Sequence, residues 1–345
     1  MRAAVLREYN KDLSIEEVPD PACPEDGVVL KVLACGVCRS DWHGWSGEHP
    51  RVKPGQIGGH EYCGEVVAAG PRATYKVGDV LVAPFILACG MCPACQSGNQ
   101  NTCPNQRLPG FVEPGAFAEY VAVPYDHNLA RLPEMLSPTV AAGLGCRVTT
   151  AWHALTGRAD VKAGEWVAVH GTGGVGLSAM LLARALGAFV VVVDVVQEKL
   201  DHALSLGADA AVNARDGDVA AKIREITKGG AHVSVEALGI EATVNPSIEC
   251  LRPLGRHVQV GMPVGHTAKM TINMNAVYMG NLALYGTRGM PSWRYPSLLG
   301  LITSGRVDMS PLIAREIPLS QTGAELAAFN GPTPPGVAVI TDFKR

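Results

Sequence analysis

The sequence has little that would suit binding to nucleic acid or to a charged lipid surface. Its 29 basic residues are opposed by 32 acidic ones, which gives a net charge of −3, and no long run of either sign occurs. Nucleic-acid binding requires a basic stripe, and attraction to a charged lipid surface requires a polybasic segment. We therefore expect neither nucleic acid nor a membrane among the partners.

Long hydrophobic runs are also missing. The N-terminal segment MRAAVLREYN contains no apolar run of signal-peptide length. The most apolar segment, AFVVVVDVV, is too short to span a bilayer and contains an aspartate. Internal repeats and low-complexity segments do not occur. With 47% hydrophobic and 18% charged residues, the composition is ordinary for a soluble globular protein, and we expect a cytoplasmic location.

Two domains are expected, because 345 residues exceed the size of a typical single core. Short β-like runs broken by turn residues, such as GVVLKVLACGV and AEYVAVP, predict a β-rich, barrel-like first domain. Later, in EWVAVHGTGGVGLSAMLLARALGAFVVVVD, apolar strands alternate with helical stretches. This alternation is typical of an α/β fold with a doubly wound parallel sheet. After about residue 287 the alternation ends, and we expect the tail to return to the first domain.

Cysteine, in contrast, is plentiful, with ten residues. In a large chain for which no export is expected, cysteines more often serve metal binding or catalysis than disulfides. Four lie close together, at Cys89, Cys92, Cys95 and Cys103, and four thiolates form a closed tetrahedral shell for Zn²⁺. This spacing predicts a structural zinc in a lobe at residues 86–104, which should unfold without its metal. The alternative is a loop of free or disulfide-linked cysteines.

A glycine-rich turn, with Gly171, Gly173 and Gly176, follows a strand-like run and precedes a helix-like stretch. In dinucleotide-binding folds such glycines allow a tight turn, close approach of the pyrophosphate and helix–strand packing, and the helix N-terminus offers N–H groups to the phosphates. Asp194 ends the next strand. A carboxylate there accepts hydrogen bonds from the adenosine ribose and repels a 2′-phosphate, which favours NAD over NADP. Lys199 could also reach the ribose. A turn without a cofactor is the alternative.

The stretch ACGVCRSDWHGW contains a CxxC pair, Cys35 and Cys38. It allows three interpretations: a redox pair, half of a zinc site, or a single reactive cysteine. A redox pair normally lies in a thioredoxin-like βαβ pattern, which is missing here, and Cys35 ends an apolar run as expected of a buried strand residue. His60 and Cys146 are further candidates. Taken singly, a buried cysteine or histidine is more often a core residue than a ligand.

Taken together, these segments resemble the zinc-dependent medium-chain alcohol dehydrogenases of the bacterial NAD-dependent type. The resemblance covers essentially the whole chain and rests on GVCRSDWH, GGHE, the four-cysteine loop, GCRVTTAW, GTGGVG and the aspartate at position 194. It implies a GroES-like catalytic domain formed by residues 1–148 and 288–345, and a Rossmann dinucleotide-binding domain at residues 149–287. It also implies a homodimer or homotetramer paired through the cofactor domains.

The resemblance further implies a catalytic zinc held by Cys38, His60 and Cys146, with an open fourth position for water or substrate. Asp41 would orient the histidine. Glu61 matches an acidic residue that the family keeps beneath the zinc, although a salt-bridged structural carboxylate is an equal interpretation. In the implied reaction, zinc lowers the pKa of the alcohol hydroxyl so that an alkoxide forms, and hydride then passes to the nicotinamide.

Proton release in this resemblance runs from Ser40 through a ribose hydroxyl to His43, because imidazole titrates near neutral pH. Arg39 matches a residue that contacts the pyrophosphate. Other positions that match cofactor-binding residues are Thr150, Gly174, Val175 and Val260. The substrate pocket falls near His49, Phe85 and Met262, which are equally well interpreted as ordinary core or loop residues. There are two departures: the segment PPGVAVITDF lacks an arginine that many relatives have, and Arg147 is bulkier than the expected small residue.

Three functions remain open from the sequence. The first is an NAD-dependent alcohol dehydrogenase, or a carbonyl reductase in the reverse direction. The second is the same fold acting on a polyol or an amino alcohol, although polyol and threonine dehydrogenases often have a carboxylate where Cys146 stands. The third is a non-catalytic NAD- or zinc-binding regulator, which would have no need of the proton relay of Ser40 and His43.

Overall fold

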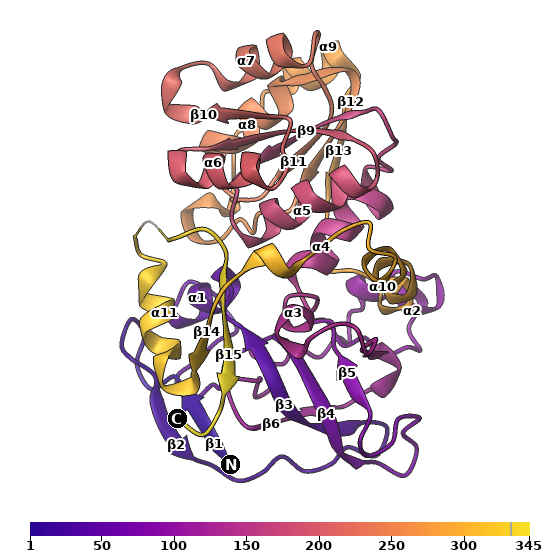
Figure 1. The fold of residues 1–345 in the computed structure, drawn as a ribbon, viewed down its shortest axis with the longest axis vertical. Coiled ribbons are helices and arrows are strands. Elements are labelled where there is room, and N and C mark those ends of the chain that lie inside the picture. Colours follow the sequence, from indigo (N-terminus) through magenta and orange to yellow (C-terminus); the bar gives the residue numbers. More distant parts are fainter. Residues whose placement is uncertain (332) are drawn as a thin grey trace. The chain divides into compact units, whose positions relative to one another are not determined.

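A computed structural model describes residues 1–331 and 333–345, which group into two compact units (Figure 1). The first unit comprises residues 1–149, 289–304 and 312–345, and the second comprises residues 150–288 and 305–311. Within the described residues, no helix combines the length and the hydrophobicity that crossing a membrane requires.

The first unit is built on a seven-stranded sheet around β3 (Val28–Gly36) and β4 (Glu61–Ala69). These two strands pair antiparallel along their length, with Gly36 opposite Glu61. The register brings the residues that follow β3 beside those that precede β4. The remaining strands of this unit are β5 (Val80–Val82), β6 (Tyr120–Val123), β7 (Ala130–Arg131), β14 (Ile313–Pro318) and β15 (Val337–Asp342) in the same sheet, and the separate pair β1 (Arg2–Val5) and β2 (Ser14–Glu17).

The apolar run of β3 is buried along almost its whole length, and only Lys31 is exposed. The core of this unit includes the fully buried side chains of Tyr62 and Phe117. Short helices and turns connect the strands. They are α1 (Arg39–Trp45), α2 (Pro93–Gln96), α3 (Pro138–Ala142), α10 (Tyr295–Thr303), α11 (Thr322–Ala328), η1 (Gln100–Thr102), η2 (Asp126–Asn128), η6 (Ser292–Arg294) and η8 (Leu319–Gln321). Two further elements, α4 (Arg147–His153) and η7 (Ser310–Leu312), have residues in both units.

The second unit holds a six-stranded parallel sheet in the order β10-β9-β8-β11-β12-β13, flanked by helices (Figure 1). This order is that of a doubly wound dinucleotide-binding sheet. The valines of β9 at 190–193 are buried, as expected of a central strand covered on both faces. The strands are β8 (Trp166–His170), β9 (Phe189–Asp194), β10 (Ala210–Asn213), β11 (Ala231–Glu236), β12 (Leu251–Gln259) and β13 (Ala283–Gly286).

The helices of the second unit are α5 (Gly174–Ala185), α6 (Gln197–Ser205), α7 (Val219–Ile226), α8 (Glu241–Glu249), α9 (Met274–Gly280), η3 (Ala154–Arg158), η4 (Ala214–Asp216) and η5 (Gly265–Ala268). The predicted fold class is confirmed, because a doubly wound parallel sheet occurs together with a β-rich unit.

Candidate metal and cofactor sites

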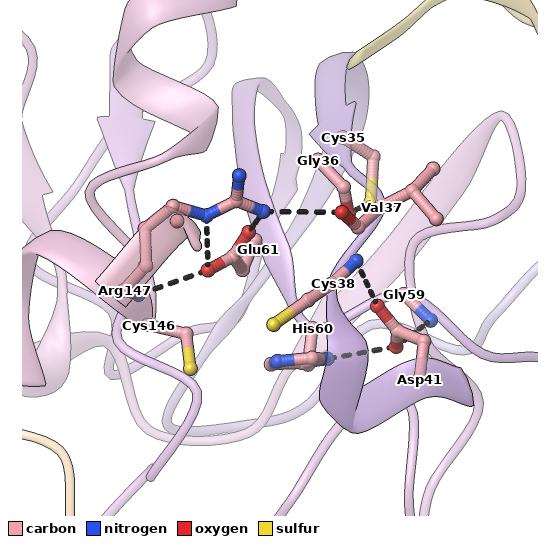
Figure 2. A network of polar contacts seen from close by, with 12 residues as sticks. Cys35, Gly36, Val37, Cys38, Asp41, Gly59, His60, Glu61, Cys146 and Arg147 are labelled. Carbon is pink, nitrogen blue, oxygen red and sulfur yellow. Dashed lines mark hydrogen bonds and ion pairs between the residues drawn. The ribbon is translucent and has the colours of Figure 1, made fainter. Parts of the chain in front are cut away.

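Three segments distant in sequence bring Cys38, His60 and Cys146 together in the first unit. Cys38 is the N-cap of α1, His60 directly precedes β4, and Cys146 directly precedes α4. Their ligand atoms, with one carboxylate oxygen of Glu61, all lie within 4.8 Å of one another, and all four residues are buried. Figure 2 shows the two sulfur atoms and the imidazole pointing toward one another.

Asp41 fixes the orientation of the histidine. Its Oδ1 lies 2.7 Å from Nδ1 of His60 and accepts a hydrogen bond from the backbone N–H of Gly59, while its Oδ2 accepts one from the backbone N–H of Cys38. Because a carboxylate only accepts, Nδ1 carries the proton. Nε2 of His60 is then an acceptor, and it is buried with no hydrogen-bond partner among the described residues.

This donor set fits a zinc ion. Hydrogen bonding by the Cys146 thiol holds the pKa of Cys38 well below its ordinary range, although burial acts in the opposite direction. Two sulfurs and the unpartnered imidazole nitrogen are soft or borderline donors, as zinc prefers, and three protein ligands leave one position open. Cys35 differs, because burial raises the pKa of its thiol well above the ordinary value. The CxxC pair therefore holds one ligand candidate and one core residue.

Glu61 points its carboxylate at Arg147. Oε1 accepts hydrogen bonds from the backbone N–H (2.9 Å) and Nε (3.0 Å) of Arg147, and Oε2 accepts one from Nη2. Burial is the largest single effect on Arg147 and opposes its charge, but attraction to Glu61 together with that to Cys38 and Cys146 outweighs burial, so the pKa of Arg147 is raised. Of the two interpretations of Glu61 that the sequence allows, this geometry favours the salt-bridged carboxylate.

The sulfur atoms of Cys89, Cys92, Cys95 and Cys103 also lie within 4.8 Å of one another. No disulfide joins them in the part of the chain that the structure describes, so four thiols are present to close a tetrahedral shell. Asn128 anchors the start of this loop, because its amide exchanges two hydrogen bonds with the backbone of Ala88, at 2.9 and 3.0 Å.

In the second unit, the glycine-rich turn lies between β8 and α5. Gly171 has a φ of +93°, and a Cβ on Gly176 would lie 1.7 Å from the carbonyl oxygen of Gly171, so the turn requires glycine at both positions. Asp194 ends β9 beside this turn and accepts hydrogen bonds from the backbone N–H (2.9 Å) and hydroxyl (2.7 Å) of Thr172. No sequence pattern pointed to Thr172, because the glycine fingerprint treats that position as a spacer.

Two predicted site residues are engaged with their neighbours in the first unit. The guanidinium of Arg39 donates to the Phe329 carbonyl (2.9 Å) and lies over the rings of Trp42 and Phe329. Nδ1 of His43 lies 2.7 Å from Oε2 of Glu48, a partner that no sequence pattern pointed to. The roles of Arg39 at the pyrophosphate and of His43 in proton transfer stay predictions.

The predicted pocket residues are distributed over both units. The ring of Phe85 lies edge-on to His60, with centroids 5.8 Å apart, and His49 stacks on Phe111 at 4.8 Å. Met262 belongs to the second unit, as do the other predicted cofactor residues Thr150, Gly174, Val175, Lys199 and Val260. A pocket or cofactor contact that combines residues of both units stays a prediction.

Comparison with known proteins identifies the class. A family described as "Alcohol dehydrogenase GroES-like domain" matches residues 24–134, and one described as "Zinc-binding dehydrogenase" matches residues 174–304. An alcohol dehydrogenase of Geobacillus stearothermophilus is 39% identical over 269 residues, covering 76% of this chain and 78% of that protein. An L-threonine 3-dehydrogenase of Pyrococcus horikoshii is 32% identical over 321 residues, covering 89% and 88%.

Among solved structures, an alcohol dehydrogenase from Thermus sp. ATN1 superposes with a TM-score of 0.92 at 30% identity, covering 99% of this chain and 100% of that one. These matches define an oxidoreductase with a GroES-like domain and a Rossmann-like parallel sheet. The chain belongs to the zinc-dependent medium-chain alcohol dehydrogenase family, and this membership supports binding of zinc and NAD(P).

Proposed function

We propose that the protein is an NAD-dependent alcohol dehydrogenase that interconverts alcohols with aldehydes or ketones, with the first unit as catalytic domain and the second as dinucleotide-binding domain. The observation that carries the proposal is the convergence of Cys38, His60 and Cys146 around an unpartnered imidazole nitrogen. A site for structure alone would use four protein ligands, whereas three leave a position for substrate.

In the proposed mechanism, Cys38, His60 and Cys146 hold a zinc ion, which when bound supplies a Lewis acid that makes an alcohol hydroxyl more acidic. Asp41 keeps the proton of His60 on Nδ1 and so keeps Nε2 available as a ligand. The rings of Phe85 and Phe111 pack against the imidazole of His60, which is fully buried.

The proton leaves through side chains of α1. Ser40 and His43 are three residues apart on this helix, so their side chains lie on the same face. The serine hydroxyl both donates and accepts. The Nδ1 of His43 is paired with Glu48, which leaves Nε2 as the ring nitrogen to receive a proton.

A structural zinc at Cys89, Cys92, Cys95 and Cys103 is part of the proposal, as is the preference for NAD. Asp194 places a carboxylate at the end of β9 beside the glycine-rich turn. A carboxylate there favours ribose hydroxyls and repels a 2′-phosphate.

We also propose that the protein forms a homo-oligomer through the second unit. β13 is an edge strand of the parallel sheet, and the neighbouring α9 exposes Met274, Tyr278 and Met279, with Tyr278 79% exposed. An unpaired edge next to exposed apolar side chains is typical of an association surface. Tyr278→Glu should therefore yield a smaller species in sedimentation analysis, and an unchanged size would contradict this interface.

One assay tests the proposed activity: NADH formation with primary, secondary and polyhydroxy alcohols and with L-threonine, together with zinc counted per chain. Two zinc ions and turnover of simple alcohols support the proposal. One zinc and no turnover on any substrate contradicts it and favours the regulator. Turnover confined to L-threonine or to polyols would favour the second candidate, which the 32% identity to an L-threonine 3-dehydrogenase keeps in the panel.

A further inference from the structure

Each of the three ligand candidates is followed or preceded by a residue of one polar network. Val37 precedes Cys38, Glu61 follows His60, and Arg147 follows Cys146. The network therefore touches every segment that contributes a ligand, although the segments come from three different places in the chain.

Arg147 is the centre of this network. Its guanidinium and backbone N–H bind both carboxylate oxygens of Glu61, and Nη2 also donates to the Val37 carbonyl at 3.3 Å. One side chain thus joins the end of β3, the start of β4 and the start of α4 (Figure 2). Neighbouring Gly36 leaves room for it, since a Cβ there would lie 2.8 Å from Oε2 of Glu61 and 3.1 Å from Nη2 of Arg147.

The pair is unusually well buried, with Arg147 2% exposed and Glu61 fully enclosed. Removing two charges from water costs free energy that their attraction does not always recover. A buried ion pair therefore contributes little to the net stability of a protein, and stability alone does not explain this one. Glu61 and Arg147 are next to His60 and Cys146 in the sequence, and Arg147 donates to the carbonyl of the residue before Cys38, so the placement of the pair points to positioning.

Glu61 itself is close enough to compete for a metal. One of its carboxylate oxygens belongs to the cluster whose ligand atoms lie within 4.8 Å of one another. Both oxygens are occupied by Arg147, which holds the carboxylate in a fork of parallel hydrogen bonds. Without the guanidinium, the carboxylate would be a fourth protein ligand at a site where the reaction needs an open position.

We propose that Arg147 is a positioning residue with two effects: it fixes the three ligand-bearing segments relative to one another, and it holds Glu61 off the metal so that the fourth position stays open. This inference rests on the proposed function, since it concerns the same metal site. It assigns a role to the one residue beside Cys146 that departs from the family pattern.

The test compares Arg147→Met, Arg147→Lys, Glu61→Gln and the double variant Arg147→Met/Glu61→Gln with the wild type. Arg315→Met is the control, because it breaks another arginine–carboxylate pair of the first unit, with Glu325, and neither residue belongs to a cysteine cluster. Zinc affinity is measured by competition with a chromophoric chelator. The site is also loaded with Co²⁺, and its visible spectrum is recorded with and without imidazole as an added ligand.

In Arg147→Met the Co²⁺ spectrum should no longer respond to imidazole, because Glu61 fills the open position. Zinc at the Cys38 site should be about 10- to 100-fold weaker in the double variant, where the supporting contact is lost and the residue at position 61 has no carboxylate to offset that loss. The four-cysteine zinc should be unchanged in both. Arg147→Lys should be intermediate, since lysine keeps the charge but lacks the fork. The double variant should regain the response to imidazole without regaining full affinity, and Arg315→Met should behave as wild type.

An unaltered imidazole response in Arg147→Met would overturn the proposal. If that variant does not fold because Glu61 is left unpaired, the double variant decides: wild-type zinc affinity in it overturns the proposal, and a 10- to 100-fold loss supports it. A wild type without metal at Cys38 would overturn the proposed function and this inference together, whereas a metal-loaded, active wild type with unaffected variants overturns this inference alone.

Discussion

Nδ1 of His60 lies 2.7 Å from Oδ1 of Asp41, and this contact determines which ring nitrogen faces the two cysteine sulfurs. Asp41 is 6% exposed, and its carboxylate also accepts hydrogen bonds from the backbone N–H groups of Cys38 and Gly59. One side chain therefore fixes the imidazole and ties it to the start of α1.

Asp41→Ala should lower zinc affinity at this site by about 10- to 100-fold, because the imidazole loses the acceptor that orients it. Asp41→Asn should lower zinc affinity less, since the side-chain carbonyl oxygen of asparagine can still accept a hydrogen bond from Nδ1 of His60. The measurement is chelator competition on the purified protein, with the four-cysteine zinc as an internal control. Equal affinities in Asp41→Ala and the wild type would show that the contact does not support a ligand.

His43→Gln tests the proton relay. Glutamine keeps hydrogen-bonding capacity but does not titrate near neutral pH, so turnover should fall by about tenfold or more and its pH dependence should change. Glu48→Gln should produce a smaller change in the same direction, because His43 stays but loses its 2.7 Å partner. A pH profile of turnover that coincides with that of the wild type would remove His43 from the mechanism.

Cys95→Ser should reduce zinc from two ions per chain to one and loosen the lobe at residues 86–104, because metal binding and local folding are coupled. Limited proteolysis and zinc analysis measure the two effects. Cys23→Ser is the control, since Cys23 is exposed and lies outside both clusters. Two retained zinc ions in Cys95→Ser would contradict a four-thiolate site.

The sequence predicts these sites to very different degrees. Cys89 to Cys103 span a short local segment, so their spacing alone predicts the cluster that forms. Cys35 is confirmed as a buried residue of β3, as its apolar run indicated. The β-rich unit and the parallel sheet are likewise recognisable, because alternation and turn residues are local signals.

Contacts between residues far apart in the sequence could not be predicted in the same way. Cys38 and His60 meet only because β3 and β4 pair with Gly36 opposite Glu61, a register that local patterns do not encode. The bulk of Arg147 was evident from the sequence. Its partner Glu61 lies far away in the sequence, at the start of β4, whereas Arg147 starts α4, and a charged pair without local spacing has no sequence signal. The pairing of His43 with Glu48 depends on how the chain turns after α1.

Two buried histidines of the second unit, His170 and His257, should make the folded protein less stable in acid. Burial, with a smaller effect of neighbouring His257, lowers the pKa of His170 to about 3, and burial lowers the pKa of His257 to about 4. Both side chains are almost fully enclosed. In the unfolded chain each would titrate near 6.5. Between pH 6.5 and the folded-state pKa of each histidine, the unfolded chain binds a proton that the folded protein does not. As the pH falls through this range, the free energy of unfolding therefore falls by about 1.4 kcal/mol per pH unit for each histidine.

His257→Gln removes one of these groups while leaving a polar side chain near the hydroxyls of Ser234 and Ser247, which lie 3.1 and 3.2 Å from Nδ1. Relative to the wild type, the variant should gain stability as the pH falls from 6.5 toward 4. Urea unfolding of both proteins at several pH values measures this difference, and metal release in acid largely cancels because it affects both. A stability difference that stays constant with pH would mean that His257 does not contribute to acid sensitivity.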